Sequence, residues 1–523
     1  NNVANIQVIN KGNIYGNDNV SGTNKNQVAF GFNNFDSSTN NTRTEMINRG
    51  NGKITLGAPE SAGIQLRPED PWSTNQGPRR GLNMMTGENS GTVKLNGYGS
   101  FGILTVKNRD LDKYKLDPNS KELAKDRDYS DPSANYKVWI AKGGQIASRS
   151  QEEFMSKIEN TASGKINVQS DDSVGIGILN TIQSVKINGE VNIGTEDPTS
   201  LAYSNKSGGT PNKVEGATGV YTQVATRPVR GREYARGSHG EQLFELDGVT
   251  PKVKQSYYDD HGLENITSTT TSYTYTDSDG KSKTVTNYKG VTIGTETVEV
   301  GGTVTLGDHA ESSYGLRNKT SQVEFTDTSK NYTTSGSITL TGNGKVYVKG
   351  KKNFGAVAEG GKYYREIKKA ADQYPERVEE VGRIDIAGLI DVTGQQSIGY
   401  VLKSGQGSNT GIIKVKGHQD NSATDKDYNG SLGFYGEKGT FTNTGIIEAS
   451  GKIAHAVVAK TSNMTFNHNG TIKVDSPNTD KGNIAVYSDG DAKVNFYNNS
   501  KVYVGDYSIG IHSADKAKFN NTF

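Results

Sequence analysis

The nonapeptide NTGIIKVKG at residues 409–417 recurs almost unchanged as NTGIIEASG at residues 443–451. Both copies fit the template Gly-x-β-x-β, in which β is Ile, Val, Leu or occasionally Ala. The alternation predicts a β-strand, with Ile413 and Val415 facing one way and the intervening lysines the other. Copies of this first template begin at Gly52, Gly91, Gly164, Gly189, Gly302, Gly336, Gly388, Gly411, Gly445 and Gly470.

A second template, Ser-x-Gly-apolar, follows the first. Its copies begin at Ser61, Ser100, Ser173, Ser313, Ser397, Ser431 and Ser508. Short strands separated by Gly and Asn turns, at a period of about 20–30 residues, predict a parallel β-solenoid. We therefore expect an all-β chain wound as a right-handed parallel β-helix (β-solenoid), with loop, hairpin and short helical excursions.

The composition agrees with such a coil. Hydrophobic residues make up only 32% of the chain, and its mean hydropathy is −0.69. This suits a solenoid, because each rung buries few side chains and neighbouring rungs supply the rest of the core. The 59 Lys and Arg residues nearly balance 57 Asp and Glu residues, so the charge gives no sign of a nucleic-acid partner. No apolar run is long enough to predict a membrane-spanning helix.

The chain contains no cysteine. This absence suits a protein that crosses an oxidising bacterial periplasm unfolded, where thiols would be trapped as disulfides; compositional drift is the alternative. The sequence opens without a signal peptide and ends within a repeat without a cap, so we expect a fragment of a longer protein.

Three stretches interrupt the templates and divide the chain. Rungs of the β-helix are expected at residues 1–107, 157–225, 290–350 and 381–523. The excursions are a charged one at residues 108–156, one with a β-hairpin at residues 226–289 and a helical one at residues 351–380.

The hairpin and the helix are predicted from their side-chain periods. In the 226–289 excursion, alternating Thr and Tyr lead to Asp277-Ser278-Asp279-Gly280 and return through Val285. In the 351–380 excursion, apolar residues at helical spacing predict a helix that Pro375 ends or kinks. These helical positions are Tyr363, Ile367 and Ala370 or Ala371.

The sequence contains few signs of a metal site or a catalytic site. The seven histidines show no metal-ligand spacing, there is no cysteine nucleophile, and no G-x-S-x-G elbow lies between a strand and a helix. A polysaccharide lyase or hydrolase built on a β-helix is the enzyme alternative, and it would need clustered acids on one face. Asp385, Asp391 and Glu448 are placed a rung or more apart. We therefore expect no enzyme, no metal and no cofactor.

The sequence contains clearer signs of ligand binding than of catalysis. The segment TRPVRGREYARGSHG at residues 226–240 gathers four arginines around a tyrosine, and YYDD follows at residues 257–260. Arg and Tyr dominate contact hot spots and suit acidic glycans or carboxylate-bearing proteins. A solvated loop whose arginines pair with local acids, such as Glu233 and Asp259, is the alternative. A second loop, PEDPWSTNQGPRRG at residues 68–81, carries a tryptophan. The candidate ligand-binding residues are Arg227, Arg230, Arg232, Tyr234, Arg236, Tyr257, Tyr258 and Trp72.

The templates, in the forms NTGIIKVKG…SLGFYG and SGKINVQSDDSVGIGI, resemble the passenger repeats of large autotransporter adhesins of Gram-negative bacteria. The Asn-rich, Lys-rich, cysteine-free style is most similar to the very large fusobacterial outer-membrane autotransporters (type V secretion), a group that includes co-aggregation and lectin-like adhesins. The resemblance implies secretion through a C-terminal membrane β-barrel, which these residues lack, and display on the cell surface.

The resemblance also implies non-catalytic adhesion to a host-cell surface protein or glycan, or to the surface of other bacteria. It transfers no functional residue, because the family's repeats are scaffold. A purely structural spacer stalk is the alternative to an adhesive segment. A trimeric autotransporter head is the alternative to the expected monomeric coil.

Overall fold

The computed structural model describes most of the chain in segments. The described residues are 4–16, 27–33, 42–67, 72–73, 77–78, 84–106, 156–179, 183–197, 212–224, 227–228, 271–276, 282–288, 297–320, 331–332, 337–365, 376–380, 382–417, 430–476, 482–514 and 518–521. All the regular secondary structure among these residues is β-strand. Most of these strands belong to three large parallel sheets, here called A, B and C, which the chain visits repeatedly in that order.

The strands of each sheet are stacked in chain order, so each pairs with its counterpart one turn earlier and one turn later. Sheet A contains β1 (Ala4–Asn10), β4 (Thr42–Asn48), β9 (Met84–Asn89), β12 (Ser156–Asn160), β15 (Gln183–Ile187), β22 (Thr297–Val300), β27 (Ser337–Leu340), β32 (Arg383–Ile386), β35 (Gln406–Asn409), β38 (Gly439–Asn443), β41 (Met464–His468), β44 (Lys493–Phe496) and β47 (Lys518–Asn521). Sheet B contains β2 (Asn13–Tyr15), β5 (Lys53–Leu56), β10 (Thr92–Leu95), β13 (Lys165–Val168), β16 (Glu190–Ile193), β23 (Thr303–Leu306), β28 (Lys345–Val348), β33 (Leu389–Val392), β36 (Ile412–Gly417), β39 (Ile446–Gly451), β42 (Thr471–Val474) and β45 (Lys501–Val504). Sheet C contains β3 (Val28–Asn33), β6 (Ala62–Arg67), β11 (Phe101–Val106), β14 (Val174–Leu179), β18 (Thr218–Val224), β25 (Tyr314–Thr320), β29 (Phe354–Glu359), β34 (Ile398–Ser404), β37 (Ser431–Gly436), β40 (Ala454–Lys460), β43 (Ile484–Asp489) and β46 (Ile509–Ser513).

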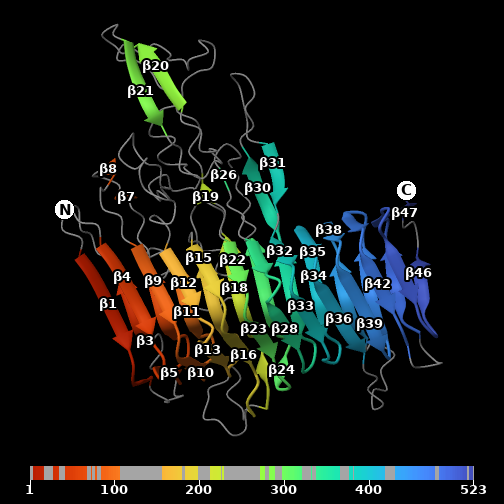
Figure 1. The fold of residues 1–523 in the computed structure, drawn as a ribbon, viewed down its shortest axis with the longest axis horizontal. Helices are drawn as coiled ribbons and strands as arrows, with labels where there is room; N and C mark the ends of the chain where they lie inside the picture. The colour runs from red at the N-terminus through yellow and green to blue at the C-terminus, as the bar shows by residue number, and fades with distance from the viewer. Residues whose placement is uncertain are drawn as a thin grey trace.

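One strand from each sheet makes a rung, and the rungs stack along a rod that runs from β1 to β47 (Figure 1). The predicted all-β parallel β-helix is therefore confirmed. Its right-handed sense stays a prediction, based on the strong preference of parallel strand crossovers for that hand.

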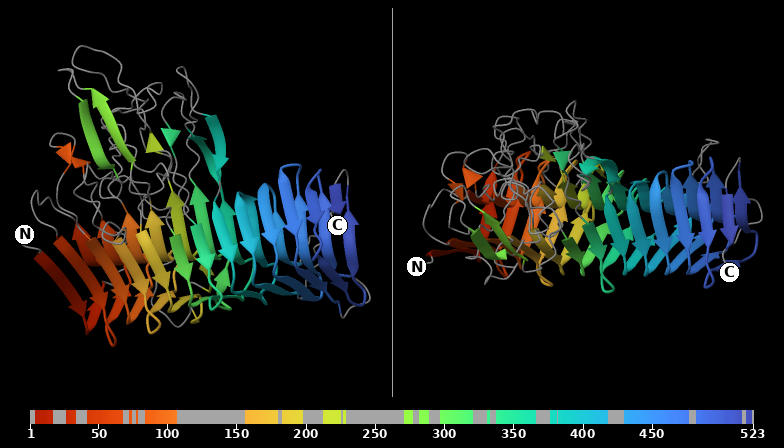
Figure 2. Two further views of the ribbon diagram at one scale, coloured as in Figure 1. Left: turned by 45° about the horizontal axis from the view of Figure 1, so that its top comes forward. Right: turned by 90° about the horizontal axis from the view of Figure 1, so that it is seen from above.

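Five two-stranded sheets lie beside the three large ones. Four are antiparallel: β7 (Trp72–Ser73) with β8 (Gly77–Pro78), β19 (Arg227–Pro228) with β26 (Asn331–Tyr332), β20 (Thr271–Thr276) with β21 (Ser282–Tyr288), and β30 (Gly361–Arg365) with β31 (Glu376–Glu380). The fifth is parallel and pairs β17 (Val214–Glu215) with β24 (Ala310–Glu311). The four antiparallel sheets all stand on one side of the rod (Figures 1 and 2).

The interior is one apolar cluster that passes through successive rungs. In β36, Ile413 and Val415 are buried and the lysines between and after them are exposed, as the alternation predicts. The neighbouring rungs place Ile390 and Ile447 in register with Ile413, so each side chain packs between its counterparts. Burying one such side chain stabilises a fold by about 1.5–3 kcal/mol, and the repetition compensates for the small core of each rung.

Glycines form a column at the corner between sheets A and B. A Cβ on Gly91 would collide with the carbonyl oxygen of Gly52, and one on Gly411 would collide with that of Gly388. Successive rungs meet backbone to backbone here, which explains the Gly of the first template. The strand predicted after Gly336 is confirmed as β27, but it belongs to sheet A, whereas the strands after the other copies belong to sheet B. In that rung the column is occupied by Gly344, which precedes the sheet B strand.

Serines form a column at the corner between sheets B and C. The backbone N–H of Ser61 donates to Oγ of Ser100, and that of Ser100 donates to Oγ of Ser173, both at 3.0 Å. The residue before the serine has a positive φ, for example 55° at Glu60 and 52° at Asp172. The second template therefore marks a turn whose backbone donors are satisfied by the next rung.

Asparagines form a buried ladder at the end of the sheet A strands. The Nδ2 group of Asn10 donates to Oδ1 of Asn48 at 2.9 Å, Asn48 donates to Asn89 at 2.8 Å, and Asn89 donates to Asn160 at 2.8 Å. Apolar residues then take the same register position in four rungs: Ile187, Val300, Leu340 and Ile386.

A second run of the ladder ends at a histidine. Asn409 donates to Asn443 at 2.7 Å, and Nδ2 of Asn443 donates to Nδ1 of His468 at 3.1 Å. The other ring nitrogen, Nε2, faces the carbonyl of Lys501 at 3.4 Å. A neutral imidazole with its proton on Nε2 satisfies both neighbours, whereas a proton on Nδ1 would break the bond from Asn443.

The chain leaves the coil mainly at the third corner, between a sheet C strand and the next sheet A strand. We call these segments inserts, and the main ones are residues 68–83, 107–155, 225–296, 321–336 and 361–381. From β34 onward the same corner is short. The 226–289 excursion contains the predicted hairpin, because β20 and β21 pair with Tyr273 opposite Val285.

The helix predicted within residues 351–380 is wrong for the described part of that stretch. Phe354–Glu359 is β29 of the coil, and Tyr363 lies in β30, which pairs antiparallel with β31. Pairing across the hairpin satisfies the backbone groups of this Tyr-rich and Val-containing sequence, which also has strand propensity. Ile367, Ala370, Ala371 and Pro375 lie outside the described residues.

Asn89→Ala should lower the free energy of unfolding by about 1–3 kcal/mol, because it leaves the side chains of Asn48 and Asn160 without their buried partner. Urea unfolding followed by circular dichroism measures the change. Asn192→Ala is the matched control: Asn192 also bonds the same residue type one rung away, but faces outward and is partly exposed. Its loss should stay below about 0.5 kcal/mol. Equal losses would contradict a special role for the buried ladder.

Acidification should weaken the C-terminal rungs through two buried histidines. Burial lowers the pKa of His455 to about 4 and also lowers the pKa of His468. The unfolded chain, with a histidine pKa of about 6.5, binds these protons first as the pH falls. The free energy of unfolding should therefore decrease between about pH 6.5 and pH 4.

The double variant His455→Gln with His468→Asn should lose less stability than the parent between pH 7 and pH 4.5. Asn at position 468 can continue the ladder, and Gln at position 455 can still accept from the backbone N–H of Ile484. Urea unfolding at both pH values measures the difference. An unchanged pH dependence in the double variant would refute the assignment.

Candidate functional site

The inserts bear the residues that the sequence singled out for binding. Arg227 lies in β19 and Trp72 in β7, so both belong to inserts at the same corner, several rungs apart. The other candidates lie outside the described residues: Arg230, Arg232, Tyr234, Arg236, Tyr257 and Tyr258. Their role in binding stays a prediction.

Three of the inserts are joined to one another. Strand β19, in the 225–296 insert, pairs with β26 of the 321–336 insert, and Arg227 is in register with Tyr332. Strand β26 in turn lies against β30 of the 361–381 insert. No local sequence pattern indicated these contacts, because β19 and β26 are very short and become neighbours only through the stacking of their rungs.

A buried ionic cluster lies on the sheet C strands from which these inserts leave. Arg317 Nη2 donates to Oε1 of Glu359 at 3.3 Å, and Nζ of Lys403 donates to the same oxygen at 2.9 Å. The guanidinium carbon of Arg317 lies 4.4 Å from the ring centre of Tyr314 and 5.9 Å from that of Tyr221. The cluster thus links strands β18, β25, β29 and β34.

Each charged group in this cluster stabilises the ionised form of its neighbour, despite the cost of burial. Burial disfavours the charged form of Arg317, but Glu359 and the neighbouring tyrosines outweigh it and raise the pKa of the guanidinium. Burial also disfavours the carboxylate of Glu359, but Arg317 and Lys403 outweigh it and hold its pKa below the usual value. Both groups are therefore ionised at neutral pH, and the cluster acts as an ionic clamp at the base of the inserts.

The same sheet carries a second apolar cluster on its outer side. Leu104 and Tyr221 directly follow the core residues Ile103 and Val220 and so face away from the interior. All five members of the cluster are fully buried: Ala62, Phe101, Leu104, Val174 and Tyr221. The outer face of a surface sheet normally contacts water, whereas this part of sheet C is shielded from solvent.

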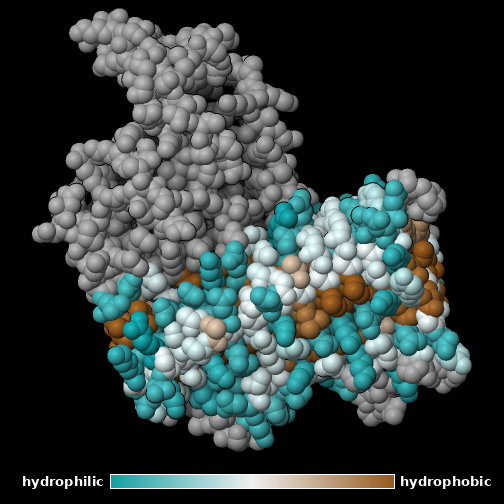
Figure 3. Space-filling view, viewed as in Figure 1, coloured by the Kyte–Doolittle hydropathy of each residue, from teal (hydrophilic) through white to brown (hydrophobic). Residues whose placement is uncertain are grey.

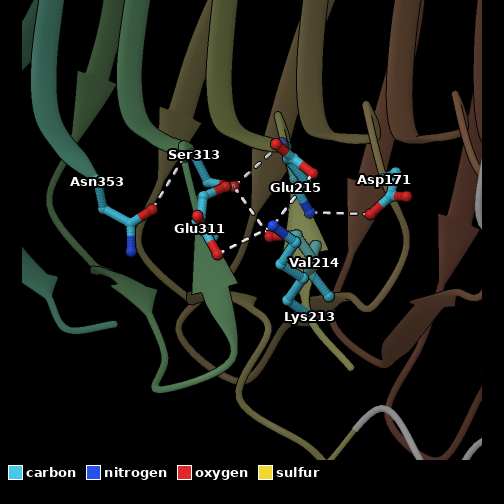
Figure 4. Close-up of polar contacts among 8 residues, drawn as sticks. Asp171, Lys213, Val214, Glu215, Glu311, Ser313 and Asn353 are labelled. Atoms are coloured by element: carbon cyan, nitrogen blue, oxygen red, sulfur yellow. Dashed lines mark hydrogen bonds and ion pairs between the residues drawn. The ribbon is translucent and has the colours of Figure 1, made fainter. Parts of the chain in front are cut away.

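The corner between sheets B and C carries a polar network of a different kind (Figure 4). Lys213 Nζ donates to Glu311 at 3.0 Å and lies 3.5 Å from Glu215, whose backbone N–H donates to Asp171 Oδ1 at 2.8 Å. The hydrogen bond to Glu311 raises the pKa of Lys213. These side chains are partly exposed, so their ion pairs contribute little to the stability of the fold. They connect β17 to β24.

The acids considered for a lyase or hydrolase lie on different strands. Asp385 is on sheet A, where Arg383 and Ser408 both bond it at 2.6 Å. Asp391 and Glu448 lie two rungs apart on sheet B, with Lys414 in register between them. Over the part of the chain that the structure describes, no three His, Asp or Glu side chains gather as a metal site.

The described surface is mostly hydrophilic, with a hydrophobic strip across the C-terminal half of the rod (Figure 3). Sheet B places three outward-facing apolar residues, Leu389, Ile412 and Ile446, in register on neighbouring strands, and Ile412 is 39% exposed. These three side chains offer no polar group to orient a ligand. The insert corner is therefore the better candidate site.

Arg317→Met should lower the free energy of unfolding by about 2 kcal/mol, because it leaves the largely buried Glu359 carboxylate with Lys403 as its remaining cationic partner in the clamp. Lys403→Met, which removes the more exposed cation, should cost less than about 1 kcal/mol. Urea unfolding of the two variants measures both values. A loss for Arg317→Met no greater than for Lys403→Met would show that the clamp is not a stabilising unit.

No helix long or apolar enough to cross a membrane occurs in the described segments. Comparison of the chain with protein-family models, with curated proteins and with solved structures gives no match.

Proposed function

We propose that this chain is a segment of a bacterial surface adhesin that binds without catalysis through the inserts of its β-helix. The observation that carries the proposal is the gathering of the inserts at one corner of a rigid coil. Loops held by a rigid scaffold are the usual place for binding residues, because they can vary while the scaffold keeps them in position.

Two further observations support a binding role for the inserts. The inserts are joined through β19, β26 and β30, and their base is held by the Arg317 clamp. A spacer stalk needs neither feature, since stacked rungs alone give it length. An enzyme would need converging acids or a metal site, and Asp385, Asp391 and Glu448 lie on three different strands.

The location and the partner are also part of the proposal. The resemblance of the templates to autotransporter passengers favours display on the outer membrane of a Gram-negative bacterium. The partner is then a host-cell surface protein or glycan, or the surface of another bacterium, and the segment acts as a monomer. The Arg- and Tyr-rich composition of residues 226–258 suits such contacts.

Replacing residues 226–289 with a short Gly-Ser linker should abolish or strongly reduce attachment of the purified chain to host cells or to partner bacteria. Flow cytometry of the labelled protein measures attachment, and circular dichroism checks that the β-rich spectrum is kept. The matched control replaces residues 418–429, which follow β36 and precede β37 and so belong to a different corner, the one between sheets B and C.

The control replacement should leave attachment unchanged. If the folded 226–289 replacement binds as well as the parent, this insert is not the adhesive site. If neither the parent nor the control attaches to any cell, the spacer alternative is favoured.

A further inference from the structure

We propose that sheet A carries a second binding surface in the C-terminal half of the rod, and that it fits a linear, uncharged polysaccharide lying along the rod axis. This surface, here called the polar face, consists of the outward-facing residues Gln406, Ser408, Thr440, Thr442, Thr465, Asn467 and Asn495. The inference goes beyond the proposed function, because it concerns strands of the coil and not the inserts.

The polar face has the regular spacing of the coil. Its side chains form two columns in register along the rod: Gln406, Thr440 and Thr465 in one, and Ser408, Thr442, Asn467 and Asn495 in the other. Successive strands lie about 4.8 Å apart, so each column repeats at that interval. One sugar unit of an extended polysaccharide covers a similar length, so a chain along the rod meets polar groups from both columns at each rung.

The polar face differs from the earlier part of sheet A in its charge. Most earlier strands carry a charged residue at the register position of Ser408 and Thr442, namely Glu88, Glu159, Lys186, Glu299 and Asp385. From β35 to β41 the two columns contain no charged residue, and the next charge is Lys493 in β44. These strands offer a ligand hydroxyl and amide groups without an ionic partner, which favours an uncharged ligand.

Several groups of the polar face are free to bond a ligand. Within the described part of the chain, the hydroxyls of Thr440, Thr442 and Thr465 have no hydrogen-bond partner. Oδ1 of Asn467 accepts from Nδ2 of Asn495 at 2.8 Å, which orients both amides and leaves Nδ2 of Asn467 without a partner among the same residues. Donors and acceptors are therefore available on both columns.

The polar face is held in place from the interior. Phe441 and Phe466 point inward between the two columns, and their rings stack with centroids 5.9 Å apart. Asn443 and His468, at the ends of the same strands, belong to the buried ladder. The outward groups are therefore fixed before a ligand arrives, so binding requires little ordering of the protein.

An aromatic ring borders the polar face. Tyr497 follows β44, is 40% exposed, and its hydroxyl donates to Oδ1 of Asn467 at 3.4 Å. A tyrosine has an apolar ring with a polar tip, and a sugar ring likewise combines apolar C–H faces with hydroxyls. Tyr497 therefore adds a stacking surface beside the hydrogen-bonding groups.

The binding test uses the full chain and three uncharged β-1,4-linked hexasaccharides as probes: cellohexaose, mannohexaose and chitohexaose. Isothermal titration calorimetry measures the affinity. At least one hexasaccharide should bind, and the disaccharide of the same sugar should bind about tenfold more weakly, because it contacts fewer rungs.

Thr442→Val should weaken this binding about fivefold, because it removes one hydroxyl and keeps a β-branched side chain of similar shape. Thr442→Ser keeps a hydroxyl and should bind within about twofold of the parent. Thr305→Val is the matched control, since Thr305 is also partly exposed but faces outward on sheet B, and it should leave binding unchanged. Circular dichroism checks that each variant keeps the parental β-rich spectrum.

Three results would overturn the polar face as a binding site. They are no binding of any of the three hexasaccharides, equal affinities for Thr442→Val and the parent, and tighter binding of the acidic polymer polygalacturonate than of the uncharged probes.

The 226–289 replacement separates this inference from the proposed function. It should retain hexasaccharide binding even where it no longer attaches to cells. Loss of hexasaccharide binding in the folded replacement would place the polysaccharide site in the inserts and overturn the inference. If the replacement still attaches to cells, the proposed role of that insert fails, and the polar face is supported by hexasaccharide binding that Thr442→Val weakens.

Discussion

Register between successive rungs is the constraint on which the rest of this structure depends. A parallel β-helix repeats each position directly above its counterpart, so a side chain must suit its own rung and both neighbouring rungs. Glycine at the A–B corner, serine at the B–C corner and asparagine at the end of sheet A each satisfy this condition in a different way. One avoids a steric collision, one accepts a backbone hydrogen bond, and one both donates and accepts along the column.

The templates allowed most of the coil to be predicted, because corners need particular residues. Gly-x-β-x-β located most strands of sheet B, and Ser-x-Gly-apolar located just over half of those of sheet C. The copy at Gly336 also predicted a strand, but that strand belongs to sheet A. The strand Ser337–Leu340 has the same alternation as a sheet B strand, and only its pairing with β22 and β32 assigns it to sheet A.

The inserts could not be predicted in the same way. Around Tyr363, the spacing of apolar residues fitted a helix, but pairing between β30 and β31 favours strands. The pairing of β19 with β26 depends on two two-residue strands that have no pattern of their own. Neighbouring rungs carry their corners to the same place, and the chain between them then makes contacts that its local sequence does not specify.

The orientation of the inter-rung hydrogen bonds determines how the rod would respond to a pulling force. These bonds run along the axis of the rod, while the strands run across it. Tension applied to the chain at one end therefore loads the bonds of the terminal rung first and peels rungs away one after another. The Asn ladder, the Ser column and the Arg317 clamp resist this peeling at particular rungs, so the force should rise and fall along the molecule. A shear load across many rungs at once would meet a far higher resistance.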